Sequence, residues 1–413
     1  MALLKPFKAV RPKKELVKKV QCPPYDVVSY DEAKHYCKHL ESFMHVIRAE
    51  IDLPENTPHY GKAVYEKARE NLESLINDNI LIKDEKPSYY LYKQKMNDHE
   101  QIGLVACASI DEYQQNKIKK HELTRKEKED DRTNHVYTVG ANTGPVFLTF
   151  KSKDDIEALF QKLINKLEPV YDFVDENSVQ HTVYLVNSGE MIKEINDTFK
   201  NVSELYIADG HHRAASASRV REKMKEETKN HSVDEEYNYF LSVIFPHTHL
   251  NVLDYNRVVK DLNGFSKNEF LKYIGDNFII KEADEVPYEP KNRHEFGMFL
   301  DNNWYVLKPK KGTFDNNDPV KSLDVAILQN NLLEPVLGIK NPRSDSRIDF
   351  IGGIRGLKEL ETRVENGWAV AFSMYPTSIE ELMKVADESM VMPPKSTWFE
   401  PKLRSGLFVH LLK

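Results

Sequence analysis

The sequence predicts a mixed α+β protein, and three observations indicate this class. Amphipathic stretches alternate with short apolar runs; residues 62–80, for example, place Val64, Ala68 and Leu72 on one helical stripe. Glycine is scarce, at 16 of 413 residues, which disfavours a loop-rich architecture. The sequence contains no heptad run and no repeat with a period of about 20 to 50 residues.

The expected elements follow one another in mixed order along the chain. Strands are expected where short apolar runs occur: at residues 102–110, 146–150, 182–186, 204–208, 239–245, 304–307 and 368–374. Helices are expected at residues 62–80, 155–167, 214–227, 320–333, 356–366 and 378–387, and after an N-cap serine at position 266. Residues 112–120 are expected to form a hairpin-like connection, and the polar residues 117–135 are expected outside the core.

The length allows two to three domains at about 150 residues each. We expect a division into residues 1–261, which carry the candidate site residues described next, and a C-terminal α/β region, 262–413, that packs on the first.

Composition limits the class of protein. The formal charge of −7 disfavours a general nucleic-acid coat protein, because such proteins concentrate positive charge. No apolar run approaches the length of a membrane span, and the basic N-terminus lacks the apolar core of a secretory signal. Three cysteines cannot form a disulfide framework. We therefore expect a cytoplasmic protein without a membrane or nucleic-acid partner.

The strongest local signal is YIADGHHRAA at residues 206–215. A strand followed at once by Asp-Gly and a helix presents unpaired backbone N–H groups at the helix N-terminus, where anions and especially phosphates bind. The candidate phosphate-binding residues of this turn are Asp209, Gly210, His211, His212 and Arg213. The alternative is an ordinary N-cap followed by solvated histidines.

A second group of polar residues lies at 117–135, in HELT and EDDRTNH. Phosphoryl transfer needs cations against developing charge, a carboxylate for a metal, and a group that positions the attacking hydroxyl. We take His121 and Glu122 as catalytic candidates and Arg132 as a substrate-binding candidate. The alternative is a solvated charged face.

Two N-terminal motifs contribute further candidates. Glu50 follows apolar residues in HVIRAEIDLP and is the preferred general base. Arg48 would share its side of a strand and is a substrate-binding candidate, for a phosphate or the substrate carboxylate. In PPYDVV, two prolines fix the backbone before Tyr25, which can contact a ligand. The alternatives are a surface glutamate and a turn with an aspartate cap.

The C-terminal run PPKSTWFEPKLRSG places consecutive donors in a loop suited to anion binding, so Lys395, Ser396 and Thr397 are candidate substrate-binding residues. No P-loop spacing is present. Zinc spacings are also absent, whereas Mg²⁺ held through substrate phosphates and one or two carboxylates leaves little trace in a sequence. Asp209 and Glu122 are the candidate metal ligands.

The motifs together identify a family. The chain resembles the bacterial and archaeal DUF1015 family in KPFKAVRP (5–12), PPYDVV (23–28), HVIRAEIDLP (45–54), KKHELT (119–124), EDDRTNH (129–135), YIADGHHR (206–213), RIDFIGG (347–353) and MPPKSTWFEPKLRSGL (392–407). The DGHHR turn is also similar to the phosphate-binding turn of the ParB/sulfiredoxin-like superfamily. The resemblance implies a nucleotide-binding core of that fold with a larger α/β elaboration.

Relatives with this turn include kinases of free serine. The resemblance therefore implies phosphoryl transfer from ATP or ADP, with Mg²⁺, to the hydroxyl of L-serine, and in those kinases an N-terminal glutamate has the role proposed for Glu50. Sulfiredoxin chemistry is unsupported, because His211 stands where those enzymes have a cysteine. The alternatives are a nucleotide-binding regulatory protein without catalysis and, more weakly, a DNA-associated protein.

Overall fold

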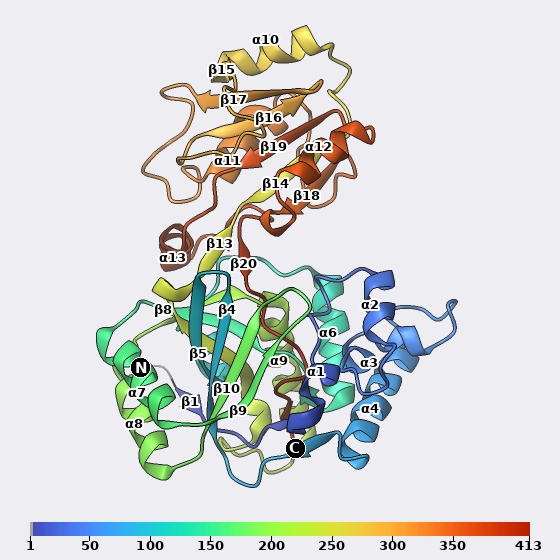
Figure 1. Ribbon diagram of the computed structural model, residues 1–413, viewed down its shortest axis with the longest axis vertical. Coiled ribbons are helices and arrows are strands. Elements are labelled where there is room, and N and C mark those ends of the chain that lie inside the picture. The colour runs from blue at the N-terminus through green and yellow to red at the C-terminus, as the bar shows by residue number, and fades with distance from the viewer. Residues whose placement is uncertain (1–2) are drawn as a thin grey trace. The chain divides into compact units, whose positions relative to one another are not determined.

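The chain forms two compact units in this computed structural model, which describes residues 3–413. One unit comprises residues 1–250 together with 401–413, and the other comprises residues 251–400. The chain thus leaves the first unit after Leu250 and returns to it at Pro401 for its last residues (Figure 1). The expected division into residues 1–261 and a C-terminal region 262–413 that packs on them stays a prediction.

The first unit is built on a nine-stranded mixed sheet with the order β6-β11-β8-β12-β5-β4-β10-β9, in which β1 pairs with β5. Its strands are β1 (Leu4–Lys5), β4 (Tyr89–Met96), β5 (His99–Ser109), β6 (Ile118–Lys119), β8 (Val146–Phe150), β9 (Pro169–Val174), β10 (Gln180–Val186), β11 (Leu205–Asp209) and β12 (Tyr239–Pro246). Strands β8 and β11 are antiparallel, and their register places Asp209 opposite Phe147. The end of β11 therefore lies beside the start of β8.

Helices cover this sheet because their apolar stripes need burial. Side chains of α7, α8 and α9 share one core with the sheet, including Ile156, Phe160, Phe199, Ala214 and Ala217. The longer helices are α4 (Lys62–Asn77), α6 (Lys126–Val139), α7 (Asp154–Lys166), α8 (Gly189–Phe199) and α9 (His211–Glu227). Shorter elements are α1 (Val17–Val20), α2 (Tyr30–Tyr36), α3 (Met44–Ile47), α5 (Ile110–Gln114), and the strand pairs β2 (Val10–Pro12) with β3 (Leu81–Lys83) and β7 (Ala141–Asn142) with β21 (His410–Leu411).

The second unit contains a six-stranded antiparallel sheet with the order β15-β17-β16-β19-β14-β18. Its strands are β14 (Tyr255–Val259), β15 (Phe278–Glu282), β16 (Phe296–Leu300), β17 (Asn303–Pro309), β18 (Ile348–Gly352) and β19 (Val370–Met374); β13 (Asn251–Leu253) pairs separately with β20 (Trp398–Glu400). Its helices are α10 (Lys267–Asn277), α11 (Asp324–Leu328), α12 (Lys358–Glu365) and α13 (Ile379–Asp387). The predicted N-cap Ser266 forms a capping box with Glu269.

The mixed α/β class is confirmed, but three local expectations were wrong. The predicted connection at 112–120 includes the end of helix α5 and strand β6. The segment expected outside the core buries His121, Asp131 and His135, because each has polar or aromatic partners inside the unit. The predicted strand around Arg48 and Glu50 is instead a pair of short helical turns. Within residues 3–413, no helix is long and apolar enough to cross a membrane.

Candidate functional site

The turn between β11 and α9 forms the centre of the candidate site. Gly210 is the N-cap of α9 and has φ +94°, a conformation that favours glycine. A Cβ at this position would also lie 3.5 Å from the Cα of Val146 on the neighbouring strand. In the 17-residue helix α9 the N–H of Arg213 already donates to the carbonyl of Gly210 at 2.9 Å, whereas those of His211 and His212 precede this first bond of the helix. This end of the helix therefore favours an anion.

Asp209 closes β11 and is neutralised by a lysine from the end of the chain. Lys402 Nζ lies 3.0 Å from Asp209 Oδ2, and the backbone N–H of Gly210 donates to Oδ1 at 2.7 Å. Burial by itself would raise the pKa of Asp209, but Lys402 and then Arg213 outweigh it and hold that pKa well below its usual range. Asp209 is therefore a carboxylate, and the turn carries two cations beside it.

His211 lies against His121 beneath the turn. The two rings meet edge to face with centroids 4.4 Å apart, and the backbone N–H of His121 donates to Nε2 of His211 at 3.5 Å. Burial lowers the pKa of His121 to about 4 and that of His211 well below its usual range. Glu122 Oε2 lies 3.8 Å from His211 Nδ1. Both histidines are thus neutral near pH 7, which suits supporting or hydrogen-bonding roles rather than charge.

His212 points to a different segment from His211. Its Nε2 accepts the backbone N–H of Arg125 at 3.0 Å, just before helix α6 begins. Burial, followed by Lys128, lowers the pKa of His212. This histidine joins the first turn of α9 to the start of α6.

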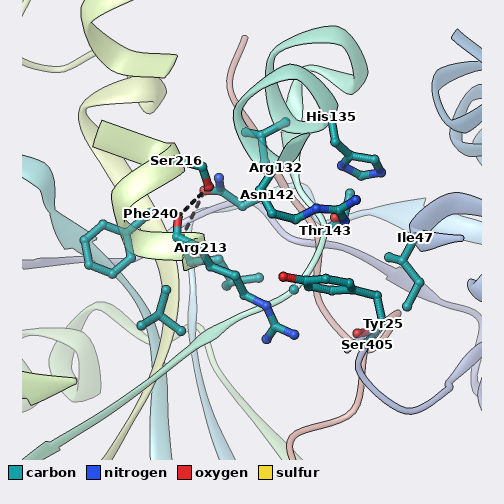
Figure 2. Close-up of a pocket in the computed structure, with 14 residues that line it drawn as sticks. Tyr25, Ile47, Arg132, His135, Asn142, Thr143, Arg213, Ser216, Phe240 and Ser405 are labelled. Carbon is teal, nitrogen blue, oxygen red and sulfur yellow. Dashed lines mark hydrogen bonds between the residues drawn. The ribbon is translucent and has the colours of Figure 1, made fainter. Parts of the chain in front are cut away.

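Tyr25 lies between two arginines that come from α6 and α9 (Figure 2). The guanidinium carbon of Arg132 is 4.2 Å from the centre of the Tyr25 ring, and that of Arg213 is 5.6 Å away. Arg213 Nη1 donates to the carbonyl of Pro145 at 2.7 Å, and Nη2 lies 3.6 Å from Asp26 Oδ1. The PPYDVV loop therefore meets the DGHHR turn through Tyr25 and Asp26.

Glu50 and Arg48 form an ion pair, although the predicted strand is absent. Glu50 lies in a 3-10 helix, Ala49–Asp52, and its Oε1 is 2.6 Å from Arg48 Nε. Arg48 Nη1 also donates to the carbonyls of Tyr25 and Val28, at 3.2 and 3.1 Å. The pair thus holds the loop that presents Tyr25 and Asp26.

A small cavity lies beside Tyr25. Its volume is about 30 Å³, which is room for a few water molecules. Its walls come from the PPYDVV loop, α6, the segment before β8, α9, β12 and the C-terminal segment (Figure 2). The lining residues are Tyr25, Ile47, Arg132, His135, Val136, Asn142, Thr143, Gly144, Val146, Arg213, Ser216, Phe240, Leu241 and Ser405.

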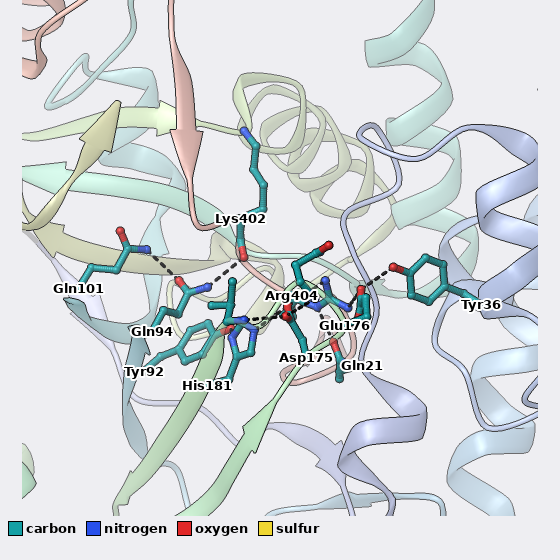
Figure 3. A network of polar contacts seen from close by, with 12 residues as sticks. Gln21, Tyr36, Tyr92, Gln94, Gln101, Asp175, Glu176, His181, Lys402 and Arg404 are labelled. Carbon is teal, nitrogen blue, oxygen red and sulfur yellow. Dashed lines mark hydrogen bonds and ion pairs between the residues drawn. The ribbon is translucent and has the colours of Figure 1, made fainter. Parts of the chain in front are cut away.

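A buried polar network holds the C-terminal segment in the first unit (Figure 3). Arg404 lies 3.4 Å from Asp175 and 2.7 Å from Glu176, and it also donates to Gln21. Two residues earlier, Gln94 Nε2 donates to the carbonyl of Lys402 at 2.9 Å. These contacts fix the backbone from which Lys402 reaches Asp209.

The structure does not place every predicted residue in the first unit. Lys395, Ser396 and Thr397 belong to the second unit. There Lys395 Nζ is 5.3 Å from the centre of the Tyr255 ring, and Ser396 Oγ donates to a carbonyl within its own loop at 2.6 Å.

Two residues of the first-unit site were not among the predicted site residues. Asp26 stands in the PPYDVV motif and Lys402 in the PPKSTWFEPKLRSG run, and both motifs are candidate ligand-binding segments in the sequence. Only the folded structure assigns these two residues to the site, because each contacts the DGHHR turn from a distant part of the chain.

The predicted metal ligands do not form a protein-only metal site. Among residues 3–413, no three His, Cys, Asp or Glu side chains are grouped so as to hold a metal ion. Asp209 is paired with Lys402, and Glu122 is half exposed near His211. One or two carboxylates are nevertheless sufficient for Mg²⁺ that arrives with nucleotide phosphates, so Asp209 and Glu122 fit that restricted role.

A family model described as "Protein of unknown function (DUF1015)" matches residues 4–326. The chain belongs to the DUF1015 family. In this DUF1015 protein the match covers the first unit up to Leu250, including the turn, and extends to the start of α11. No curated protein matches the chain.

Solved structures similar to this DUF1015 protein include a mutant free serine kinase in complex with AMP. That match has 15% identity and a TM-score of 0.36, and it covers 71% of this chain and 87% of the kinase. A second mutant of free serine kinase, in complex with ADP, gives the same values. SbnI with C-terminal truncation from Staphylococcus aureus is 10% identical with a TM-score of 0.38, covering 74% of this chain and 87% of SbnI.

Proposed function

We propose that the protein is a nucleotide-dependent phosphotransferase that transfers a phosphoryl group from ATP or ADP to the hydroxyl of free L-serine. The observation that carries the proposal is the β11–Gly210–α9 turn, with Arg213 and Lys402 as cations beside it. The acceptor and donor come from the similarity of the DGHHR turn to that of free serine kinases. Transfer forms a bond between the serine oxygen and the terminal phosphorus and breaks the bridging P–O bond.

The phosphates of the nucleotide would bind at the N-terminus of α9. The first-turn N–H groups and the helix dipole favour negative charge there, and Arg213 adds a planar guanidinium. Lys402 is held beside Asp209 and can interact with a phosphate oxygen from the same position. Mg²⁺, when bound, would neutralise charge between the phosphates, with Asp209 or Glu122 as its protein ligand.

A carboxylate is needed to orient the serine hydroxyl and accept its proton. We propose Asp26 for this role, ahead of Glu50 and Glu122. The carboxylate of Glu50 is engaged by Arg48, which in turn holds the loop carbonyls. Asp26 has a partly exposed side chain, 39%, and lies 3.6 Å from Arg213 of the phosphate-binding turn.

The test is incubation of the protein with L-serine, Mg²⁺ and either ATP or ADP, followed by detection of O-phosphoserine. Product with one donor is expected. A folded protein that makes no product with either donor contradicts the serine kinase, and saturable nucleotide binding without turnover then favours the regulatory alternative. Salt-dependent DNA binding would instead favour the DNA-associated alternative.

The base assignment is tested by three matched amide variants, Asp26→Asn, Glu50→Gln and Glu122→Gln. Each keeps the size of its side chain and removes the negative charge. We expect Asp26→Asn to lose turnover by about 100-fold or more while nucleotide binding persists. If Glu50→Gln or Glu122→Gln loses turnover and Asp26→Asn does not, the role of Asp26 is wrong.

A further inference from the structure

The cavity beside Tyr25 contains donors that the phosphate turn does not use. Arg132 Nε and Nη2 both contact Asp131 Oδ2, at 2.8 and 2.7 Å, which leaves Nη1 without a hydrogen-bond partner among the described residues. The Asp131 carboxylate also accepts the hydroxyl of Tyr65 at 3.0 Å. Arg132 is thereby fixed in place with one N–H edge still available.

A buried histidine lines the same cavity with an unsatisfied nitrogen. His135 is 2% exposed; its Nε2 contacts the carbonyl of Val46 at 2.9 Å, and its Nδ1 has no partner among residues 3–413. Burial, and then Arg132, lower the pKa of His135 to about 3, so the ring is neutral. Because Nε2–H donates to the Val46 carbonyl, Nδ1 is an acceptor, and a buried acceptor without a partner is costly. An N–H or O–H group of a ligand in the cavity would satisfy it.

The cavity borders the proposed site of phosphoryl transfer. Arg213 of the first turn of α9 forms one wall, and Gly144 forms another close to it. A Cβ at Gly144 would lie 3.3 Å from the guanidinium carbon of Arg213, so glycine leaves the room that this side chain occupies. Asp26 follows Tyr25 directly in the chain and contacts Arg213.

We infer that this cavity binds the carboxylate of the acceptor amino acid, with Arg132 as its main ligand and the Thr143 hydroxyl beside it, while Nδ1 of His135, a hydrogen-bond acceptor, faces the ammonium group. The inference rests on the proposed function, because it assigns the recognition group of the acceptor. Arg213 lines the same cavity as Arg132 and lies 3.6 Å from Asp26, so an amino acid bound through Arg132 would lie next to the proposed base and the α9 turn. A substrate without a carboxylate would leave the buried N–H donors of Arg132 without a hydrogen-bond partner.

The size and charge of the cavity favour a carboxylate over a nucleotide phosphate. Its open volume admits only a small group, and a carboxylate is planar and matches a guanidinium edge. Asp131 already lies against Arg132, so a dianionic phosphate would meet stronger repulsion than a single negative charge.

Calorimetric titration of the AMP-saturated full chain with L-serine and with ethanolamine tests the inference, since ethanolamine is serine without its carboxylate. L-serine binding is expected, with ethanolamine at least about 100-fold weaker. Arg132→Lys keeps the positive charge but removes the planar guanidinium that can bind a carboxylate through two N–H groups. We expect this variant to weaken serine binding about 10-fold and to leave the AMP Kd unchanged. Thr143→Val is a nearly isosteric second variant, expected to weaken serine binding a few-fold.

The matched control is Arg219→Gln, which removes an arginine on α9 that pairs with Glu129 and Asp130 outside the cavity. It is expected to bind both ligands as the unaltered protein does. The inference is overturned if the unaltered protein binds no L-serine, if Arg132→Lys and Thr143→Val both bind it normally, or if Arg132→Lys weakens AMP instead.

Binding and turnover separate this inference from the proposed function. One outcome is that the unaltered protein binds serine but makes no O-phosphoserine, and Arg132→Lys no longer binds serine. This outcome supports carboxylate binding in the cavity and contradicts the serine kinase activity. O-phosphoserine formation with an unchanged KM for serine in both cavity variants supports the kinase and contradicts the cavity.

Discussion

Lys402 Nζ lies 3.0 Å from Asp209 Oδ2, so the C-terminal segment supplies a cation to the turn between β11 and α9. Lys402→Met removes this charge and retains much of the side-chain length. We expect nucleotide binding to weaken about 10-fold, because a charged hydrogen bond to phosphate is lost. Equilibrium binding of AMP and ATP measures the effect.

The control for that variant is Lys193→Met, which changes an exposed lysine on α8 that pairs with Asp197. Equal nucleotide affinities for Lys402→Met and the unaltered protein would show that Lys402 serves Asp209 alone and does not contact phosphate.

Gly210 has φ +94° at the N-cap of α9, where any other residue is strained. Gly210→Ala is expected to cost about 1–2 kcal/mol of stability. It should also weaken nucleotide binding, because the N–H groups of the first turn move. Gly312→Ala is a matched control: Gly312 has φ +86° with open space around it in the second unit. If both variants bind nucleotide equally well, the turn is not the phosphate site.

Arg404 is buried at 4% exposure and paired with Asp175 and Glu176. Arg404→Gln leaves the buried carboxylate of Asp175 without this cation, so we expect a loss of about 3–5 kcal/mol in the free energy of unfolding. Chemical denaturation measures it. The exposed Arg219 pairs with similar groups on the surface, and Arg219→Gln should cost less than about 1 kcal/mol. Comparable losses for the two variants would contradict a structural role for the Arg404 network.

Asp324 in the second unit predicts a pH dependence of stability. Burial raises its pKa from 3.8 to about 7. The folded state therefore holds a proton that the unfolded state has released between these pH values, and stability falls as pH rises from about 4 to 7. This increase in the pKa of Asp324 corresponds to a loss of at most about 4 kcal/mol in the free energy of unfolding.

Asp324→Asn removes this titration, so it should flatten the fall in stability and raise the unfolding midpoint at pH 8. The exposed Asp315→Asn is the control in the same unit and should leave the slope as it is. Thermal unfolding followed from pH 4 to 8 decides between the outcomes, and an unchanged slope in Asp324→Asn would be evidence against the buried acid.

Much of the local structure could be predicted because it depends on near neighbours in the chain. The apolar run at Val146–Phe150 is a buried strand, Ser266 caps α10, and Asp-Gly between Tyr206 and Arg213 forms a strand–turn–helix. Each follows from periodicity, capping or glycine conformation. The helical turns around Glu50 were missed because short apolar runs fit strands and helices equally well.

The sequence by itself determined the mixed α/β class and the strand–turn–helix at DGHHR, since these depend on residues within a few positions of one another. Only the tertiary structure decided which distant side chains meet that turn. Antiparallel pairing of β8 with β11 brings Pro145 to Arg213, and the return of the chain at Pro401 brings Lys402 to Asp209. The physical reason is that these contacts, across 68 and 193 residues of chain, depend on strand pairing and buried ion pairs, which leave no period or spacing in the sequence.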